Sequence, residues 1–160
     1  MPRQVLARAA LNAATLDEAI SILTTVSRAG AFHHTLGQMG DSRLFSVEAT
    51  GTGCSVTPLR EVFAHANHLI HPQLAAVEQV ITDSSRSRQQ RLNAWLGTQS
   101  HLDGAAALGI LSDQHDPALP IYRLSPNDPD EENTLATAIF TLSMSEIKWQ
   151  IFTHDRQKPA

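Results

Sequence analysis

Residues 62–72 have the sequence VFAHANHLIHP, the most informative stretch of this chain. It starts as an apolar run typical of a strand and ends at Pro72, whose missing N–H interrupts a ladder of hydrogen bonds. Asn67 stands between two histidines, where the predicted strand gives way to a turn. Further along, residues 83–92 (DSSRSRQQRL) predict the start of a helix.

The chain before this stretch predicts two helices followed by short strands. Residues 15–18 (TLDE) have the form of a capping box, in which Thr15 caps a helix and Glu18 reaches back to it. Apolar residues then recur at helical spacing, which indicates an α-hairpin. From Ala31 onward the pattern changes to alternation broken by tight turns, which predicts an antiparallel meander. The expected strands are residues 32–39, 43–50, 54–57 and 61–66.

The chain after this stretch predicts helices and then a hairpin. Residues 72–81 are expected to form a short helix, Asp83 or Ser84 to cap the next one, and Asp103 to begin another. Residues 134–142 and 146–153 are rich in β-formers and predict a hairpin, and the polar tail from Asp155 is expected to fray. Runs of strands and runs of helices favour an α+β fold with an antiparallel sheet and flanking helices. Residues 1–160 are predicted to form a single domain.

Composition excludes several classes of protein. With 42% apolar and 18% charged residues, 160 residues are enough to bury a core without metal or disulfides. A net charge of −4 argues against a nucleic-acid binder, which needs a basic face. No run approaches the about 18 apolar residues of a membrane span, and the first residues lack the pattern of a signal peptide. A cytoplasmic location is therefore the default expectation, with no membrane partner.

Two groups of residues suggest a chemical role, but each also has a simpler structural interpretation. His65, His68 and His71 are spaced three apart, as zinc ligands on a helix can be. A strand entering a turn would scatter their rings, so neither a metal nor any other cofactor is predicted. The basic residues Arg86, Arg88 and Arg91 can bind a carboxylate or phosphate, although a solvated helix face is the preferred interpretation.

Three residues are candidate nucleophiles. The chain has one cysteine, Cys54, which follows Gly53 as at a self-processing junction, where a freed α-amino group acts as base. A lone cysteine is more often a small buried apolar residue. Ser84 and Ser85 carry hydroxyls, but serine before a helix is first of all a cap.

Asn67 is the candidate catalytic residue. An asparagine at the end of a core strand presents an amide N–H₂ group on a rigid backbone, which is the geometry that stabilises an oxyanion. An asparagine that only forms the turn is the alternative interpretation.

Several segments, in order, resemble the acyl-coenzyme A:6-aminopenicillanic acid acyltransferase family of self-processing N-terminal-nucleophile (Ntn) hydrolases. Residues 65–68 (HANH) resemble that family's His-Thr-Asn-His, the most specific match. The other similar segments are residues 2–11 (PRQVLARAAL), 16–19 (LDEA), 45–48 (FSVE), 84–92 (SSRSRQQRL), 111–115 (LSDQH) and 133–137 (NTLAT).

The resemblance implies one half of an Ntn-hydrolase αββα sandwich. It also implies acyltransferase or amidohydrolase activity on an amide or thioester, such as an acyl-CoA, through an acyl-enzyme. Asn67 would be the oxyanion-hole residue, and His65 and His68 would hold the turn. The family is also grouped with cysteine peptidases, and its nucleophilic cysteine begins the processed chain. Cys54 does not match that cysteine.

The expected partner is therefore an N-terminal portion or separate subunit that carries the nucleophile, since a truncated chain would be inactive alone. The alternative is a non-catalytic remnant that forms a homodimer or binds another partner through an exposed sheet face.

Overall fold

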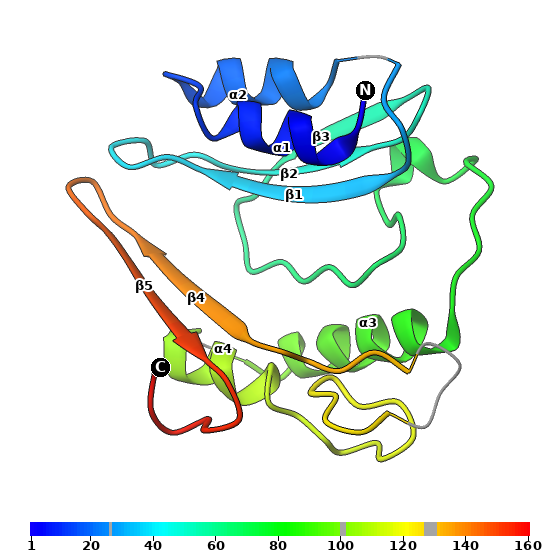
Figure 1. The fold of residues 1–160 in the computed structure, drawn as a ribbon, viewed down its shortest axis with the longest axis vertical. Coiled ribbons are helices and arrows are strands. Elements are labelled where there is room, and N and C mark those ends of the chain that lie inside the picture. Colours follow the sequence, from blue (N-terminus) through cyan, green and yellow to red (C-terminus); the bar gives the residue numbers. More distant parts are fainter. Residues whose placement is uncertain (26, 100–101, 127–130) are drawn as a thin grey trace. The chain divides into compact units, whose positions relative to one another are not determined.

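The computed structural model describes residues 1–25, 27–99, 102–126 and 131–160, which form an α+β protein as predicted. The described elements, shown in Figure 1, are α1 (Arg3–Ala10), α2 (Leu16–Leu23), β1 (Phe32–Gly37), β2 (Leu44–Ala49), β3 (Cys54–Pro58), the 3₁₀ turn η1 (Pro72–Leu74), α3 (Asp83–Leu96), α4 (Gly104–Ile110), β4 (Thr137–Leu142) and β5 (Ile147–Phe152). The chain separates into two compact units. The first comprises Met1–Phe63, Leu69–Gln79 and Leu142–Glu146, and the second Ala64–His68, Val80–Thr141 and Ile147–Ala160.

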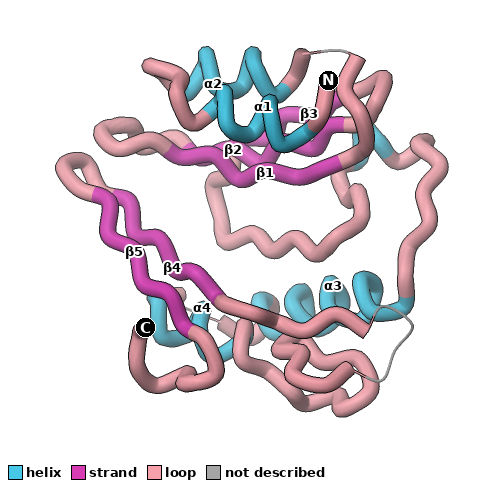
Figure 2. Tube along the Cα trace, viewed as in Figure 1, coloured by secondary structure: helices cyan, strands magenta, loops and turns pink. Residues whose placement is uncertain are grey.

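The first unit is a layer of two helices on an antiparallel sheet, as Figures 1 and 2 show. The sheet order is β1-β2-β3, so the predicted meander is confirmed. Leu6 of α1, Leu23 of α2 and Val47 of β2 form the core between helices and sheet, and each is at most 3% exposed. The predicted α-hairpin is confirmed as well. This helix-on-sheet layer is consistent with one half of an αββα sandwich.

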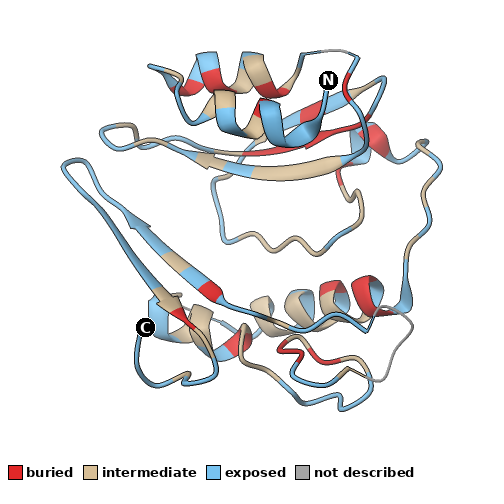
Figure 3. Cartoon of the chain, viewed as in Figure 1, coloured by how far each residue is buried: buried red, intermediate tan, exposed pale blue. Residues whose placement is uncertain are grey.

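The last four residues of the central strand β2 are buried (Figure 3), although only one face of the strand packs on the helices. Ser46 and Glu48 alternate with Val47 and Ala49, and all four have no exposed surface. A buried carboxylate is stable only with hydrogen-bond partners. Glu48 has them in the backbone N–H groups of residues 70 and 71, so this face of the sheet positions that segment.

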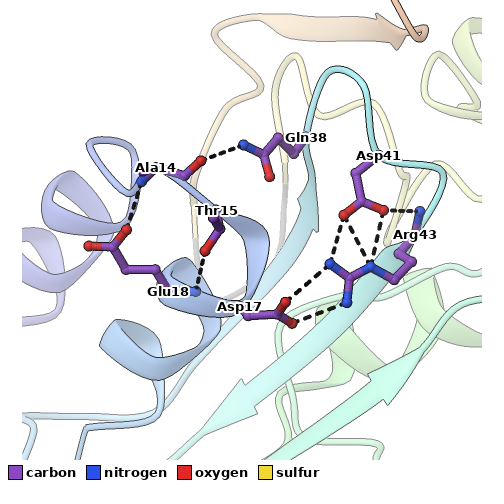
Figure 4. Close-up of polar contacts among 7 residues, drawn as sticks. All are labelled: Ala14, Thr15, Asp17, Glu18, Gln38, Asp41 and Arg43. Atoms are coloured by element: carbon purple, nitrogen blue, oxygen red, sulfur yellow. Dashed lines mark hydrogen bonds and ion pairs between the residues drawn. The ribbon is translucent and has the colours of Figure 1, made fainter.

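The N-terminus of α2 is fixed by its own cap and by the turn between β1 and β2 (Figure 4). Thr15 Oγ1 accepts a hydrogen bond from the Glu18 N–H at 3.1 Å, as the capping box predicts. The Glu18 carboxylate reaches the N–H of Ala14 rather than that of Thr15, which differs from the expected box by one residue. Arg43 then joins Asp41 in the turn to Asp17 in the first turn of α2, with the closest N–O distances 2.7 and 3.1 Å.

Arg28 attaches the end of α2 to the turn between β2 and β3. Its guanidinium is buried and donates to the carbonyl oxygens of Thr24, Thr25, Thr50 and Gly53, at 2.8–3.1 Å. A cation at the C-terminal end of a helix is favoured by the helix dipole. Nothing in the local sequence pattern predicts this contact.

The second unit contains α3, α4 and most of the hairpin of β4 and β5. The hairpin and the cap of α4 by Asp103 are as predicted. The tail was expected to fray, but Arg156 donates to Ser112 Oγ, to the carbonyl of Leu111 and to Thr137 Oγ1. Its guanidinium also lies 4.5 Å from the ring centroid of Tyr122, so the tail is anchored.

Three local predictions are wrong. Residues 61–66 form no strand, and the predicted helix at residues 72–81 is only the short turn η1. Thr82, rather than Asp83 or Ser84, caps α3, with Thr82 Oγ1 accepting from the N–H of Ser85 at 3.2 Å.

No helix among the described residues is long and apolar enough to cross a membrane.

Candidate functional site: the segment around Asn67

Residues 64–66 are held by a side chain in place of a neighbouring strand. Gln89 of α3 donates to the carbonyl of Ala64 at 2.9 Å and accepts from the N–H of Ala66 at 2.7 Å. A side-chain amide has one donor side and one acceptor side, so it pairs with a backbone as a strand would. Gln89 is only 6% exposed, and this contact satisfies the backbone of a segment without regular structure.

Asn67 is held by two residues of α3 at its backbone and at its side chain. Its N–H donates to Ser85 Oγ at 3.0 Å, and Arg88 Nη1 donates to its Oδ1 at 3.1 Å. Its Nδ2 makes no hydrogen bond within the described residues, and the side chain is exposed. Asn67 therefore presents a free N–H₂ donor on a fixed segment.

Asn67 lines a pocket of about 300 Å³ in the second unit. The lining residues are Asn67, His68, Val80, Thr82, Ser85, Arg88 and Glu132. The pocket includes the first turn of α3, where the helix dipole favours negative charge, and the guanidinium of Arg88 adds a formal positive charge. Among the described residues of the lining, Glu132 is the carboxylate. The N-terminus of α3, the guanidinium of Arg88 and the N–H₂ group of Asn67 therefore surround this pocket with partial or full positive charge.

Ser85 and His68 form a hydrogen-bonded pair beside Asn67. The Ser85 Oγ to His68 Nδ1 distance is 2.8 Å, within the range seen between a nucleophile and its base. Ser85 is only 2% exposed, and its oxygen also accepts the N–H of Asn67. Because the Ser85 hydroxyl accepts one backbone hydrogen bond and pairs with one imidazole, its role is to hold the segment around Asn67.

The three histidines spaced three residues apart, His65, His68 and His71, have separate surroundings. His65 Nδ1 contacts the carbonyl of Ala66, and His68 contacts Ser85. His71 belongs to the first unit, where it is 4% exposed and bonds to Ser46 Oγ and Ser55 Oγ at 2.8 and 2.9 Å. Within the described ranges, no group of three His, Cys, Asp or Glu residues is arranged to hold a metal ion.

Residues 69–71 are also held by side chains, all within the first unit. Gln79 accepts the N–H of Leu69 at 2.8 Å and donates to its carbonyl at 3.0 Å. Glu48 accepts the N–H groups of Ile70 and His71 at 2.6 and 3.0 Å. Gln79, Gln89 and Glu48 were missed as scaffold residues, because polar residues in a helix or on a strand look like surface residues.

The other candidate residues lie elsewhere. Cys54 is exposed at the start of β3 and belongs to the first unit, whereas the pocket of Asn67 is formed by residues of the second. Ser84 is 3% exposed, and its Oγ has no hydrogen-bond partner among the described residues. It does not line the pocket either.

Two of the three arginines of α3 differ from the expected solvated face. Arg86 is exposed, Arg88 binds Asn67, and Arg91 makes a two-pronged ion pair with Asp113 at 2.9 and 3.0 Å. The hydrogen bonds from Arg91 lower the pKa of the Asp113 carboxyl below its ordinary value, because they favour the ionised form. This pair lines a second pocket of about 310 Å³.

The chain is thus an α+β protein with an exposed side-chain amide, that of Asn67, at a pocket of its second unit. The sequence model of the family described as acyl-coenzyme A:6-aminopenicillanic acid acyl-transferase matches residues 1–157. The chain belongs to this family, as its motifs predicted. The comparisons with curated proteins and with solved structures gave no match.

Proposed function

We propose that this chain takes part in acyl transfer from an amide or thioester, such as an acyl-CoA, through an acyl-enzyme, with Asn67 as an oxyanion-hole donor. The observation that supports the proposal is the free Nδ2 of Asn67 at a pocket, in a chain that belongs to an acyltransferase family. An N–H donor aimed at the developing oxyanion stabilises the transition state more than the substrate, which is what accelerates the reaction.

The nucleophile is proposed to come from outside this segment. The second unit, which holds the pocket of Asn67, contains no cysteine in its sequence, and the buried Ser85 hydroxyl is bonded to the Asn67 backbone and to His68. We therefore propose residues 1–160 as the C-terminal portion of an Ntn-type acyltransferase or amidohydrolase. An N-terminal portion or subunit with a leading cysteine would complete it, and this part would be incomplete or inactive alone, because an oxyanion donor without a nucleophile forms no acyl-enzyme.

The test begins with the native protein. Its intact mass is measured, any co-purifying chain is identified by its N-terminal residue, and the preparation is assayed with acyl-CoA and amide substrates. We expect a chain or segment that begins with cysteine, together with a burst of acyl-enzyme. A lone 17.4 kDa chain without acyl-transfer activity contradicts the proposal.

The role of Asn67 is tested in the active preparation by Asn67→Asp. This change keeps an oxygen for Arg88 but removes the N–H₂ donor, so kcat is expected to fall by roughly a hundredfold or more. Asn12→Asp is the matched control, because Asn12 is exposed in the first unit and the hydrogen bond described for its side chain is from Arg8. An unchanged kcat in Asn67→Asp rules out the oxyanion role.

A non-catalytic binding module, including a homodimer, is the second candidate function. The second-unit part of the hairpin exposes Phe140, Ile147 and Trp149 at 62%, 50% and 62%, which is unusual for large apolar side chains on a monomer. This function predicts a stable dimer or complex that Phe140→Ser with Trp149→Ser dissociates. The measurement is sedimentation velocity, and a monomer before and after the substitutions contradicts a homodimer.

A further inference from the structure

The side-chain amide of Asn67 has a fixed orientation, which follows from the chemistry of arginine. A guanidinium donates hydrogen bonds and accepts none. The atom of Asn67 that faces Arg88 Nη1 at 3.1 Å must therefore be the oxygen Oδ1, and the nitrogen Nδ2 must occupy the opposite position. This assignment needs no observation of the hydrogens.

Two side chains from one face of α3 hold the residue at both ends. Ser85 and Arg88 are three residues apart, so they lie one above the other on the helix. Ser85 Oγ holds the backbone N–H of Asn67 and Arg88 holds the side-chain oxygen. With the backbone and Oδ1 held, the rotation that would exchange oxygen and nitrogen is opposed by the loss of a charge-assisted hydrogen bond.

The orientation matters because the two ends of an amide have opposite effects on an anion. An oxyanion beside Nδ2 receives a hydrogen bond, and an oxyanion beside Oδ1 meets a partial negative charge. An asparagine free to rotate would present its oxygen in part of the population. A fixed neighbour that holds Oδ1 removes this unproductive orientation before the reaction starts.

We propose that Arg88 is a positioning residue that keeps the Asn67 N–H₂ group directed toward the reacting carbonyl. This proposal rests on the function proposed above, and it adds a residue that works through Asn67. The competing role for Arg88 is direct contact with an anionic part of the substrate, since Arg88 lines the same pocket. The two roles predict different kinetics.

The first measurement does not need activity. The ¹H–¹⁵N peaks of the Asn67 side-chain amide are assigned by their loss in Asn67→Asp, and their heteronuclear NOE is measured. We expect a rigid amide in the wild-type protein, a mobile one in Arg88→Met, and no change in Arg86→Met, the matched control on the same helix. A rigid, unshifted amide in a folded Arg88→Met protein overturns the proposal.

The wild-type protein provides a second test that is independent of folding in the variants. With Oδ1 toward Arg88, the Hδ2 protons of Asn67 lie away from the guanidinium protons. Strong NOEs between the Hδ2 protons and the Arg88 Hη protons would therefore overturn the assigned orientation. Weak or absent NOEs, together with NOEs from Hδ2 to the other pocket residues, are the expected result.

The kinetic measurement separates the proposal from its rival in the active preparation. Positioning predicts that Arg88→Met lowers kcat roughly tenfold with KM nearly unchanged, and that it causes little further loss in the Asn67→Asp background. Direct substrate binding predicts a rise in KM that remains in that background, which overturns the positioning role. If Asn67→Asp has no effect on activity, the proposed function fails while the NMR result still decides the role of Arg88.

Discussion

Glu48 is a single carboxylate on which the placement of residues 70 and 71 depends. Its side chain has no exposed surface and accepts two backbone N–H groups. Glu48→Gln puts an N–H₂ group against one of these donors, so we expect the free energy of unfolding to fall by about 2 kcal/mol. Urea denaturation measures the change, and Glu78→Gln, at an exposed position, is the control. Equal stability of the two variants would show that the buried carboxylate is not required.

Asp113 makes part of the stability of the second unit depend on pH. Its pKa is lowered in the folded state by hydrogen bonds from Arg91. A group whose pKa is lowered on folding stabilises the protein above its ordinary pKa of 3.8, and that contribution disappears as the pH falls through the folded value. Asp113→Asn is therefore expected to lower the urea midpoint at pH 7 and to matter less at pH 3. If the urea midpoints of the wild type and Asp113→Asn differ equally at pH 7 and pH 3, the ion pair is not the source of the difference.

The sequence pointed to Asn67 as a candidate, which stays a prediction, and gave no sign of the residues that hold it. The resemblance of residues 65–68 to a family motif singled out Asn67. Its free Nδ2 depends on Arg88 and Ser85, which come from α3 and contact it only in the folded chain. Hydrophobic periodicity does not report such contacts, because it records apolar faces and treats a polar helix face as solvated.

α3 acts as a scaffold through its polar face. Ser85, Arg88 and Gln89 have the spacing of three and four residues that places side chains on one side of a helix, and all three contact residues 64–68. This element replaces the strand that was expected at residues 61–66. The apolar run there has the composition of a strand, but the prediction is wrong, because side chains and not a neighbouring strand pair with the backbone of residues 64–66.

Gln89→Ala tests this role of α3. The substitution leaves the N–H of Ala66 and the carbonyl of Ala64 without their partner, so we expect a loss of about 2 kcal/mol in the free energy of unfolding. Hydrogen–deuterium exchange should become faster at residues 64–67. Gln90→Ala, at an exposed neighbouring position, is expected to leave both quantities unchanged. Unchanged exchange in Gln89→Ala contradicts the scaffold.

The order of elements was predictable because each depends on local signals. The caps at Thr15 and Asp103, the turns of the meander and the hairpin all follow from residues within a few positions of each other. The division into two compact units was not predicted, because it depends on which distant segments pack together. Arg28 and Arg156 are two such long-range contacts, and each lies within one unit.

These two arginines allow the division itself to be tested. Arg28 joins α2 to the β2–β3 turn in the first unit, and Arg156 joins α4 to the hairpin in the second. If the units open separately, Arg28→Met should speed hydrogen exchange in the first unit alone and Arg156→Met in the second alone. Each loss leaves several carbonyls unpaired and should cost about 3 kcal/mol within its unit. Equal acceleration over the whole chain in both variants would mean that the two units unfold as one, because a shared transition spreads any local loss over every amide.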